Sequence, residues 1–157
     1  MTRTRSKPSV TLDEVSKAII EQLQQDGRRS YAAIGKVVGL SEAAVRQRVQ
    51  RLVDSGVMQV VAVTDPLELG FARQAMVGIK VTGTLDPVAD ALAELQEVDY
   101  VVITAGSYDL LVEVVAESDE HLLELISDSI RTIPGVVATE TFMYLRLRKQ
   151  TYSWGVR

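Results

Sequence analysis

Long polar side chains gather in one short stretch of the sequence, residues 41–55, which contains three arginines and two glutamines. Val45, Val49 and Leu52 recur there at the spacing of one apolar stripe on a helix, so most of the polar side chains point away from that stripe. Guanidinium and amide groups are the groups that hydrogen-bond base edges and phosphates in the major groove of DNA. The sequence therefore predicts a helix suited to a major groove.

A shorter helix precedes this stretch, and the junction has the composition of a tight turn. Ser30 and Ser41 each stand before a helical pattern, where a serine hydroxyl can accept a hydrogen bond from a free backbone N–H. Gly39 can adopt a positive φ without steric cost, and Gly35, one turn earlier, permits a close approach of the backbone. Two capped helices joined by a glycine turn indicate a helix-turn-helix.

The expected DNA contacts come from small residues at the start of the second helix and from its amides and arginines. The full predicted set is Ser41, Ala43, Ala44, Arg46, Gln47, Arg48, Gln50 and Arg51. Base edges are assigned to Arg46, Gln47 and Gln50, and phosphates to Arg48 and Arg51 together with Arg28 and Arg29. An Arg-rich helix face is also typical of an ordinary solvated surface, so the prediction depends on the combination of caps, glycine turn and clustered arginines.

Charge is distributed unevenly along the chain of 157 residues. Residues 1–60 contain ten Lys and Arg against six Asp and Glu, a net +4, whereas residues 61–157 contain seven against fifteen, a net −8. The basic part coincides with the predicted helix-turn-helix, so the overall charge of −4 does not argue against double-stranded DNA as a partner. The asymmetry favours two modules with different partners.

Composition also excludes several classes of protein. The sequence has no cysteine, which excludes disulfides and thiolate metal sites. No apolar run reaches the roughly 18 residues of a membrane span, and the basic start MTRTRSKPS lacks the apolar core of a signal peptide, so a soluble cytoplasmic protein without a membrane partner is expected. No Ser/His/Asp set, metal-ligand cluster or phosphate-binding glycine loop is present, so we expect no catalytic residues, no metal and no cofactor.

The sequence predicts two domains joined by a linker. Residues 1–63 form the DNA-binding domain, residues 64–70 (TDPLELG) the linker, and residues 71–157 the second domain. The first domain begins with a basic arm over residues 1–10 and a helix over residues 11–25, whose Thr11 and Glu14 match a capping box. It ends with a β-branched run over residues 57–63, which predicts a strand that serves as the wing.

The second domain alternates between strand and helix patterns in the order β-α-β-β-α-β. The expected strands are residues 72–81, 99–105, 109–116 and 136–148, and the expected helices are residues 86–96 and 118–133. This order predicts a ferredoxin-like α+β fold, an antiparallel four-stranded sheet with both helices on one face. Strands 101–103 and 110–115 carry apolar residues on both sides, so we expect the uncovered face to pack against a second subunit.

Four segments of the sequence resemble the Lrp/AsnC family of bacterial and archaeal feast/famine regulators. They are LSEAAVRQRVQRLVDSGVMQ (40–59), DPLELG (65–70), GSYDLLVEVV (106–115) and IPGVVATETF (133–142), and the resemblance extends over residues 12–149. It implies a winged helix-turn-helix joined to an effector-binding domain, homodimers that assemble into tetramers or octamers, and an amino acid as effector. The expected function is that of a sequence-specific transcriptional regulator.

The resemblance places the effector site at the turn between the second and third strands of the second domain. The residues at matching positions are Thr104, Gly106, Tyr108 and Asp109, together with Thr139 and Thr141 on one face of the last strand. Asp109 can accept from the ammonium group of an amino acid, and the threonine hydroxyls and the backbone near Gly106 can donate to its carboxylate. The same residues are also typical of a plain hairpin turn and of ordinary strands. Ser107 departs from the charged residue common in the family.

Two other functions stay open, an architectural DNA-binding protein without an effector and an enzyme. The siroheme decarboxylases share the two-domain plan, but such chemistry needs cationic and acid–base groups. The acidic second domain offers one histidine, His121, which is expected to be a solvated helix residue. The tail QTYSWGVR lies beyond the segments shared with the family, and Trp154 within it is expected to pack at an interface.

Overall fold

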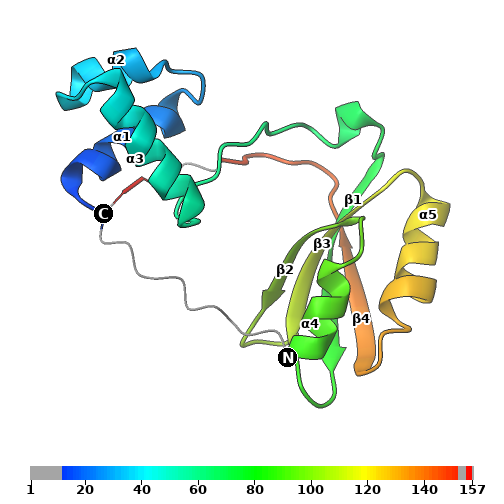
Figure 1. Ribbon diagram of the computed structural model, residues 1–157. Helices are drawn as coiled ribbons and strands as arrows, with labels where there is room; N and C mark the ends of the chain where they lie inside the picture. The colour runs from blue at the N-terminus through cyan, green and yellow to red at the C-terminus, as the bar shows by residue number, and fades with distance from the viewer. Residues whose placement is uncertain (1–11, 152–154, 157) are drawn as a thin grey trace. The chain divides into compact units, whose positions relative to one another are not determined.

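The computed structural model describes residues 12–151 and 155–156, and it divides into two compact units (Figure 1). One unit consists of the described residues up to Ala62 together with those from Lys149 onward, and the other is Val63–Arg148. The predicted basic arm, Thr11 and Trp154 lie outside the described residues. Within the described ranges, every helix is too short or too polar to cross a membrane.

The first unit is a bundle of three helices, α1 (Glu14–Gln25), α2 (Tyr31–Val38) and α3 (Glu42–Asp54), which Figure 1 shows in blue to cyan. Its core is made of one apolar residue from each of the first two helices and two from the third. These residues are Ile19, Ile34, Val45 and Val49. The predicted helix-turn-helix is therefore confirmed, with α3 in the place expected for the second helix.

The predicted caps of α2 and α3 are confirmed, whereas the predicted capping box of α1 is wrong. Ser30 and Ser41 each accept a backbone N–H through the side-chain oxygen, both at 3.2 Å. Helix α1 begins later than expected, and its N-cap is Asp13, whose carboxylate accepts the N–H of Ser16 at 2.7 Å. An aspartate is as good an N-cap as a threonine, and this one stands directly before the first helical residue.

The turn between α2 and α3 requires glycine at two positions. Gly39 ends α2 in the left-handed region with φ 73°, and the next N–H, that of Leu40, donates to the carbonyl oxygen of Gly35 at 2.9 Å. A Cβ atom on Gly35 would meet the carbonyl oxygen of Leu40 at 2.4 Å, closer than real Cβ atoms come. The missing side chain of Gly35 therefore lets the chain fold back tightly, as the sequence predicted.

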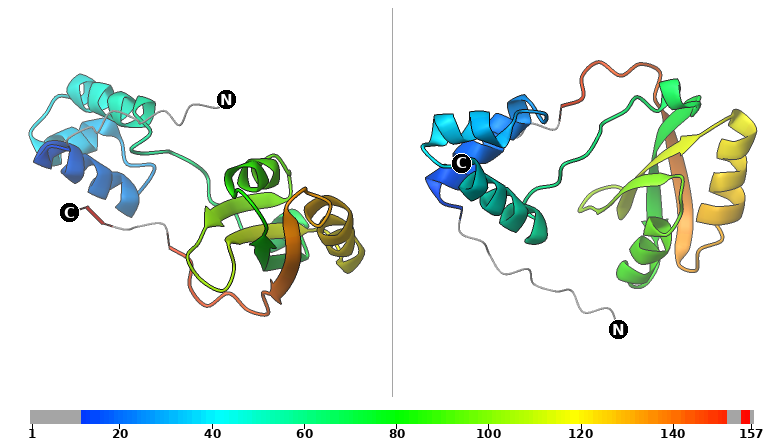
Figure 2. Two further views of the ribbon diagram at one scale, coloured as in Figure 1. Left: turned by 90° about the horizontal axis from the view of Figure 1, so that it is seen from below. Right: turned by 45° about the horizontal axis from the view of Figure 1, so that its top comes forward.

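The second unit contains a four-stranded antiparallel sheet in the order β2-β3-β1-β4 (Figure 2). The elements in chain order are β1 (Arg73–Val81), α4 (Asp86–Ala93), β2 (Val98–Ile103), β3 (Leu110–Ala116), α5 (Asp119–Glu124), a π-helix that continues α5 (Leu125–Ile130) and β4 (Val136–Met143). This order and pairing confirm the predicted ferredoxin-like fold.

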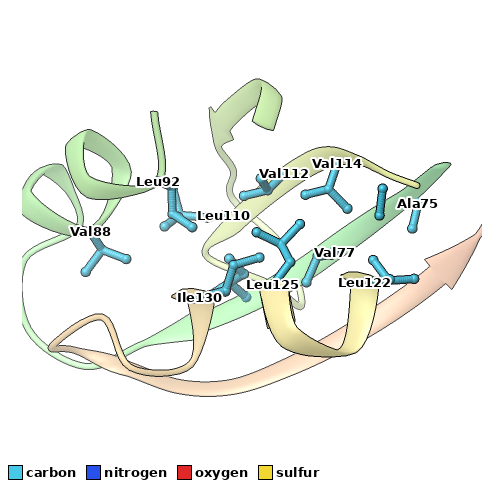
Figure 3. Packing of buried hydrophobic residues seen from close by; sticks show 12 residues of the cluster. Ala75, Val77, Val88, Leu92, Leu110, Val112, Val114, Leu122, Leu125 and Ile130 are labelled. Atoms are coloured by element: carbon cyan, nitrogen blue, oxygen red, sulfur yellow. The ribbon is translucent and has the colours of Figure 1, made fainter. Parts of the chain in front are cut away.

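One face of this sheet is covered by the two helices and holds the core of the unit (Figure 3). Val77 of β1 and Val112 of β3 point toward Leu92 of α4 and Leu125 of the π-helix, and all four are buried. Because side chains alternate along a strand, the neighbouring residues must point to the opposite face.

We refer to that opposite side of the sheet as the open face. Its residues, assigned from the strand pairing, are Gln74, Met76, Gly78, Lys80, Tyr100, Val102, Leu111, Glu113, Val115, Ala138, Glu140 and Phe142. No helix of the described second unit lies over it (Figures 1 and 2), and Tyr100 and Phe142 are 51% and 44% exposed. The open face therefore presents large apolar side chains to solvent in the single chain.

Two strand predictions are wrong. Residues 57–63 form no strand in the part of the chain that the structure describes, and Val60 and Val61 are exposed; extended residues become a strand only when a neighbour pairs with their backbone. The last strand ends at Met143 instead of residue 148; its final backbone bond to β1 runs from the N–H of Tyr144 to the carbonyl oxygen of Gln74, one residue from the start of β1.

Candidate nucleic-acid interface and effector turn

Helix α3 is buried along one side and exposed along the other. Val45, Val49 and Leu52 are buried, as predicted, and the residues on the opposite side are exposed. We call this exposed side the reading face; it consists of Ala43, Arg46, Gln47, Gln50 and Arg51. Ser41 is exposed at the helix start, whereas Ala44 and Arg48 are half-buried at the border with the core. The reading face thus brings together two amides, two guanidinium groups and one small residue.

Arg48 has partners within its own unit. Its guanidinium donates to the carboxylate of Asp13 at 2.7 Å and to the hydroxyl of Ser16 at 3.2 Å. These bonds connect α3 to the first turn of α1. The sequence predicted that Arg48 binds DNA phosphates. The signal that could have revealed these bonds is Asp13 itself, an acidic residue directly before the first helix.

The carboxylate of Asp13 has two structural roles. One oxygen caps α1 and the other binds Arg48. Hydrogen bonds from the side chain of Ser16 and from Arg48, followed by the backbone N–H of Ser16, lower the pKa of Asp13 to about 2. Asp13 therefore stays charged over the whole range in which proteins are usually studied, and it holds α3 against α1.

Arg46 is exposed but held by two neighbours. Its guanidinium donates to the carboxylate of Glu42 at 2.8 Å, and its central carbon lies 5.3 Å from the centre of the Tyr31 ring. The distance to the ring is within the range of a cation–π contact. Neither Tyr31 nor Glu42 was among the residues predicted from the sequence.

Three other residues assigned to DNA, Gln50, Arg29 and Arg28, each make a hydrogen bond within their own unit. The side-chain amide of Gln50 donates to Asp54 at 2.8 Å, and Arg29 donates to the side chain of Gln22. Arg28 is exposed, with its backbone N–H bonded to the carboxylate of Asp26 at 2.9 Å.

The predicted effector turn is closed by hydrogen bonds. The Thr104 hydroxyl donates to the carbonyl oxygen of Tyr108 at 2.6 Å, and the Thr104 N–H donates to the carbonyl oxygen of Asp109 at 2.9 Å. One carboxylate oxygen of Asp109 accepts the N–H of Val81 at 2.8 Å. Asp109 therefore fastens the turn to the end of β1. A Cβ atom on Gly106 would meet no atom within 4 Å, so the backbone there is accessible.

Tyr108 lies on the open face. Its ring covers Gly78, where a Cβ atom would come within 2.7 Å of the ring, and it meets the ring of Phe142 edge to face at 6.0 Å. Gly78 thus provides the space that the tyrosine ring occupies.

Thr139 and Thr141 lie on the other face of the sheet. They pair with Ile79 and Val77, whose side chains point toward the helices, and the Thr139 hydroxyl accepts from Arg131 at 2.9 Å. Within one chain, the six predicted effector residues are therefore separated by the sheet into two groups.

His121 is half-buried, although the sequence suggested a solvated position. Its Nδ1 accepts the N–H of Glu117 at 3.3 Å, and its Nε2 lies 3.4 Å from the carboxylate of Glu97. Among the described residues, no three His, Asp or Glu side chains gather closely enough to hold a metal ion.

A helix-turn-helix with an exposed polar helix, followed by a ferredoxin-like domain with an uncovered sheet face, defines a two-domain DNA-binding regulator. Residues 12–53 match the AsnC-type helix-turn-helix domain, and residues 71–157 match a C-terminal dimeric α+β barrel domain of AsnC-type transcriptional regulators. The chain belongs to the Lrp/AsnC family of transcriptional regulators, as its sequence indicated.

Similar proteins agree with this assignment. An HTH-type transcriptional regulator of Pyrococcus furiosus is 35% identical over 90% of this chain and 97% of its own length. The regulator FL11 of Pyrococcus horikoshii is 38% identical, with 90% and 95% covered. Among solved structures, AsnC of Escherichia coli has a TM-score of 0.76 at 25% identity, with 90% and 97% covered. A Neisseria meningitidis regulator solved with L-Met has a TM-score of 0.79 at 23% identity, with 91% and 96% covered.

The contact between Asp13 and Arg48 leads to a pH-dependent prediction. Because the folded state lowers the pKa of Asp13 from 3.8 to about 2, its stabilising effect is complete above the ordinary value and is lost as the pH falls toward about 2. Replacing Asp13 by Asn keeps a good N-cap but removes the charge. The variant should have a lower free energy of unfolding than the wild type at neutral pH, and the difference should shrink between about pH 4 and pH 2. Denaturant unfolding followed by helical circular dichroism at each pH measures this.

The matched control is Glu14→Gln, which removes a neighbouring carboxylate whose partner is Lys17 at 2.8 Å. The Glu14 side chain is 88% exposed, so this substitution should change the free energy of unfolding by less than about 1 kcal/mol. Parallel pH curves for the wild type and the Asp13→Asn variant would contradict the role given to Asp13.

Proposed function

We propose that the reading face of α3 makes sequence-specific contacts in the major groove of double-stranded DNA. The observation that supports this most directly is the position of the arginines and glutamines of α3: Arg46, Gln47, Gln50 and Arg51 are exposed while the opposite side of the helix is buried. Arg46, Gln47 and Gln50 are the candidates for base edges: the two amides lie near the middle of the exposed side, and the long side chain of Arg46 extends from its flank. Arg51, with Arg28 and Arg29, is assigned to phosphates.

Arg48 has a smaller role in the proposed binding of DNA. Its bonds to Asp13 and Ser16 make it chiefly a residue that orients α3, although its half-exposed position leaves donors that a phosphate can use. Ser41, Ala43 and Ala44 contribute through their small size, which lets the start of α3 come close to the groove.

Two substitutions separate base reading from phosphate binding. Gln47→Ala should change the preferred DNA sequence at one position, with a loss of roughly 1–3 kcal/mol of discrimination there. Arg51→Ala should weaken binding to all sequences by a similar factor and lower the slope of log affinity against log salt by about 1. Sequence selection from randomised duplexes and gel-shift titrations over a salt series measure the two effects. Unchanged affinity and preference in both variants would reject α3 as the DNA-contacting helix.

We further propose that two chains associate through their open faces. The apolar residues there need a cover, and the family description of residues 71–157 is that of a dimeric α+β barrel. A twofold dimer also presents two copies of α3, which suits half-sites one helical turn apart. Assembly of such dimers into tetramers or octamers remains part of this proposal.

A charge placed on the open face should disrupt the dimer. Tyr100→Glu puts a carboxylate at a position that is 51% exposed in the single chain, so the folded monomer should tolerate it while the dimer dissociation constant rises at least about tenfold. Leu123→Glu is the control, because Leu123 is 65% exposed and lies on α5, away from the open face. Light scattering coupled to size exclusion, with circular dichroism to check folding, measures both. Equal assembly of the Tyr100→Glu variant and the wild type would exclude the open face as the interface.

The third part of the proposal is an amino-acid effector at the turn over residues 104–109. Asp109 has one carboxylate oxygen bonded to Val81 and a second that can accept from an ammonium group, and the Gly106 backbone is accessible. The Neisseria regulator of the same fold, solved with L-Met, supports a ligand of this class. Thr139 and Thr141 can line the same pocket only if another subunit supplies them, because they lie on the opposite face of the sheet. Such a ligand changes DNA binding through its different affinities for alternative assemblies.

Asp109→Asn tests this site without opening the turn. The asparagine oxygen can still accept the N–H of Val81, but the charge that would bind an ammonium group is gone. A thermal-shift screen of the standard amino acids should find at least one that stabilises the wild type by several degrees, and the variant should lose that shift. Asp99→Asn, an exposed position on β2, should keep it. If no amino acid stabilises the wild type, an architectural DNA-binding protein without an effector is the better account; an unchanged shift in Asp109→Asn would reject this pocket.

A further inference from the structure

The guanidinium of Arg46 on the reading face is held at two points, by the carboxylate of Glu42 and by the ring of Tyr31. Tyr31 is the first residue of α2 and Glu42 is the first residue of α3, so the two helices fix the backbone positions of both neighbours. The side chain of Arg46 is nevertheless 65% exposed. The guanidinium is thus oriented by the protein but remains accessible to a ligand.

Orientation before binding has a direct consequence for recognition. A free arginine side chain loses much of its rotamer freedom when it binds, and a side chain that is already held loses less. The Tyr31 ring offers a flat surface that attracts a guanidinium without using any of its N–H donors. Glu42 uses one of the five N–H donors, so the others stay available for a partner.

The charge of Glu42 indicates which partner fits. A carboxylate 2.8 Å from the guanidinium repels a phosphate placed next to it, whereas a neutral base edge meets no such repulsion. Among base edges, guanine presents two acceptors, O6 and N7, that match the paired donors of a guanidinium. Arg46 lies at the flank of the reading face, about 100° around the helix from the buried Val45, one turn after Ala43 and one turn before Gln50, and its long side chain can reach the groove from there.

From this geometry we propose that Tyr31 is a positioning residue for base recognition, and that its ring holds Arg46 toward the edge of a guanine. The inference rests on the proposed DNA-binding role of α3 and assigns a specificity role to a residue outside that helix. Tyr31 itself touches no base in this account. It acts through Arg46.

The test compares Tyr31→Phe with Tyr31→Leu. Phenylalanine keeps the aromatic face, whereas leucine keeps apolar bulk against the helical core, on which Tyr31 packs, but offers no π surface. A pool of duplexes with a randomised centre is selected with the wild type, and the position that loses its guanine preference in Arg46→Ala is identified. The affinities of each variant are then measured for the selected duplex, for the duplex changed at that position and for an unrelated duplex.

Arg46→Ala should reduce discrimination at that one position by about tenfold or more. Tyr31→Leu should reduce it by roughly threefold at the same position, with unchanged affinity for the unrelated duplex and an unchanged salt slope. Tyr31→Phe should retain it. Tyr31→Leu added to Arg46→Ala should cause no further loss, because the ring acts only through the arginine. Thermal unfolding of each variant identifies a general loss of structure, which would weaken all duplexes alike.

The outcomes separate this inference from the proposal on which it rests. Equal discrimination by Tyr31→Leu and the wild type, while Arg46→Ala loses the guanine preference, overturns the role of Tyr31 and leaves α3 as the reading helix. A uniform weakening by Arg46→Ala assigns the arginine to a phosphate and also overturns the inference. If substitutions of Arg46, Gln47 and Arg51 all leave DNA binding unchanged, the proposed function itself fails.

Discussion

The orientation of α3 depends chiefly on the burial of one side of the helix, and the rest of the account follows from that constraint. One side of the helix is buried through Val45, Val49 and Leu52, and the bond between Arg48 and Asp13 joins the edge of that side to α1. A helix held in this way cannot roll without exposing apolar surface and breaking an ion pair. Its opposite side can therefore carry polar groups whose directions are set before any DNA arrives, which is the condition for reading base edges with few side chains.

The sheet of the second unit is also covered on only one of its two faces within one chain. Helices cover that face, whereas the other exposes Tyr100 and Phe142, and the predicted effector residues fall on both faces. In the proposed assembly, a copy packed on the open face covers the apolar side chains, and a further copy brings Thr139 and Thr141 near the turn of another chain. An arrangement that is complete only in an assembly gives an effector a physical way to act, because a ligand that binds between copies changes which assembly is stable.

Much of this structure could be predicted from sequence because local chemistry decides it. The serine caps, the glycine turn and the helical stripes of α3 depend on neighbours within a few residues, and all were found as expected. The bond of Arg48 to Asp13 and the contact of Arg46 with Tyr31 were not predicted, because they join residues far apart along the chain whose meeting is set by packing. The failed strand at residues 57–63 shows the same limit: β-branched residues favour an extended backbone, but pairing requires a partner. The separation of Tyr108 from Thr139 became visible only once the strand register was known.

The absence of cysteine from the sequence permits a direct test of the central claim, that the exposed side of α3 is the surface buried by DNA. A single thiol is introduced at Ala43 on the reading face or at Glu21, an exposed position on α1, and its alkylation rate is measured with and without a duplex obtained by selection. The account predicts that DNA slows modification at position 43 many-fold and leaves position 21 unchanged. Equal rates at position 43 with and without bound DNA would contradict it.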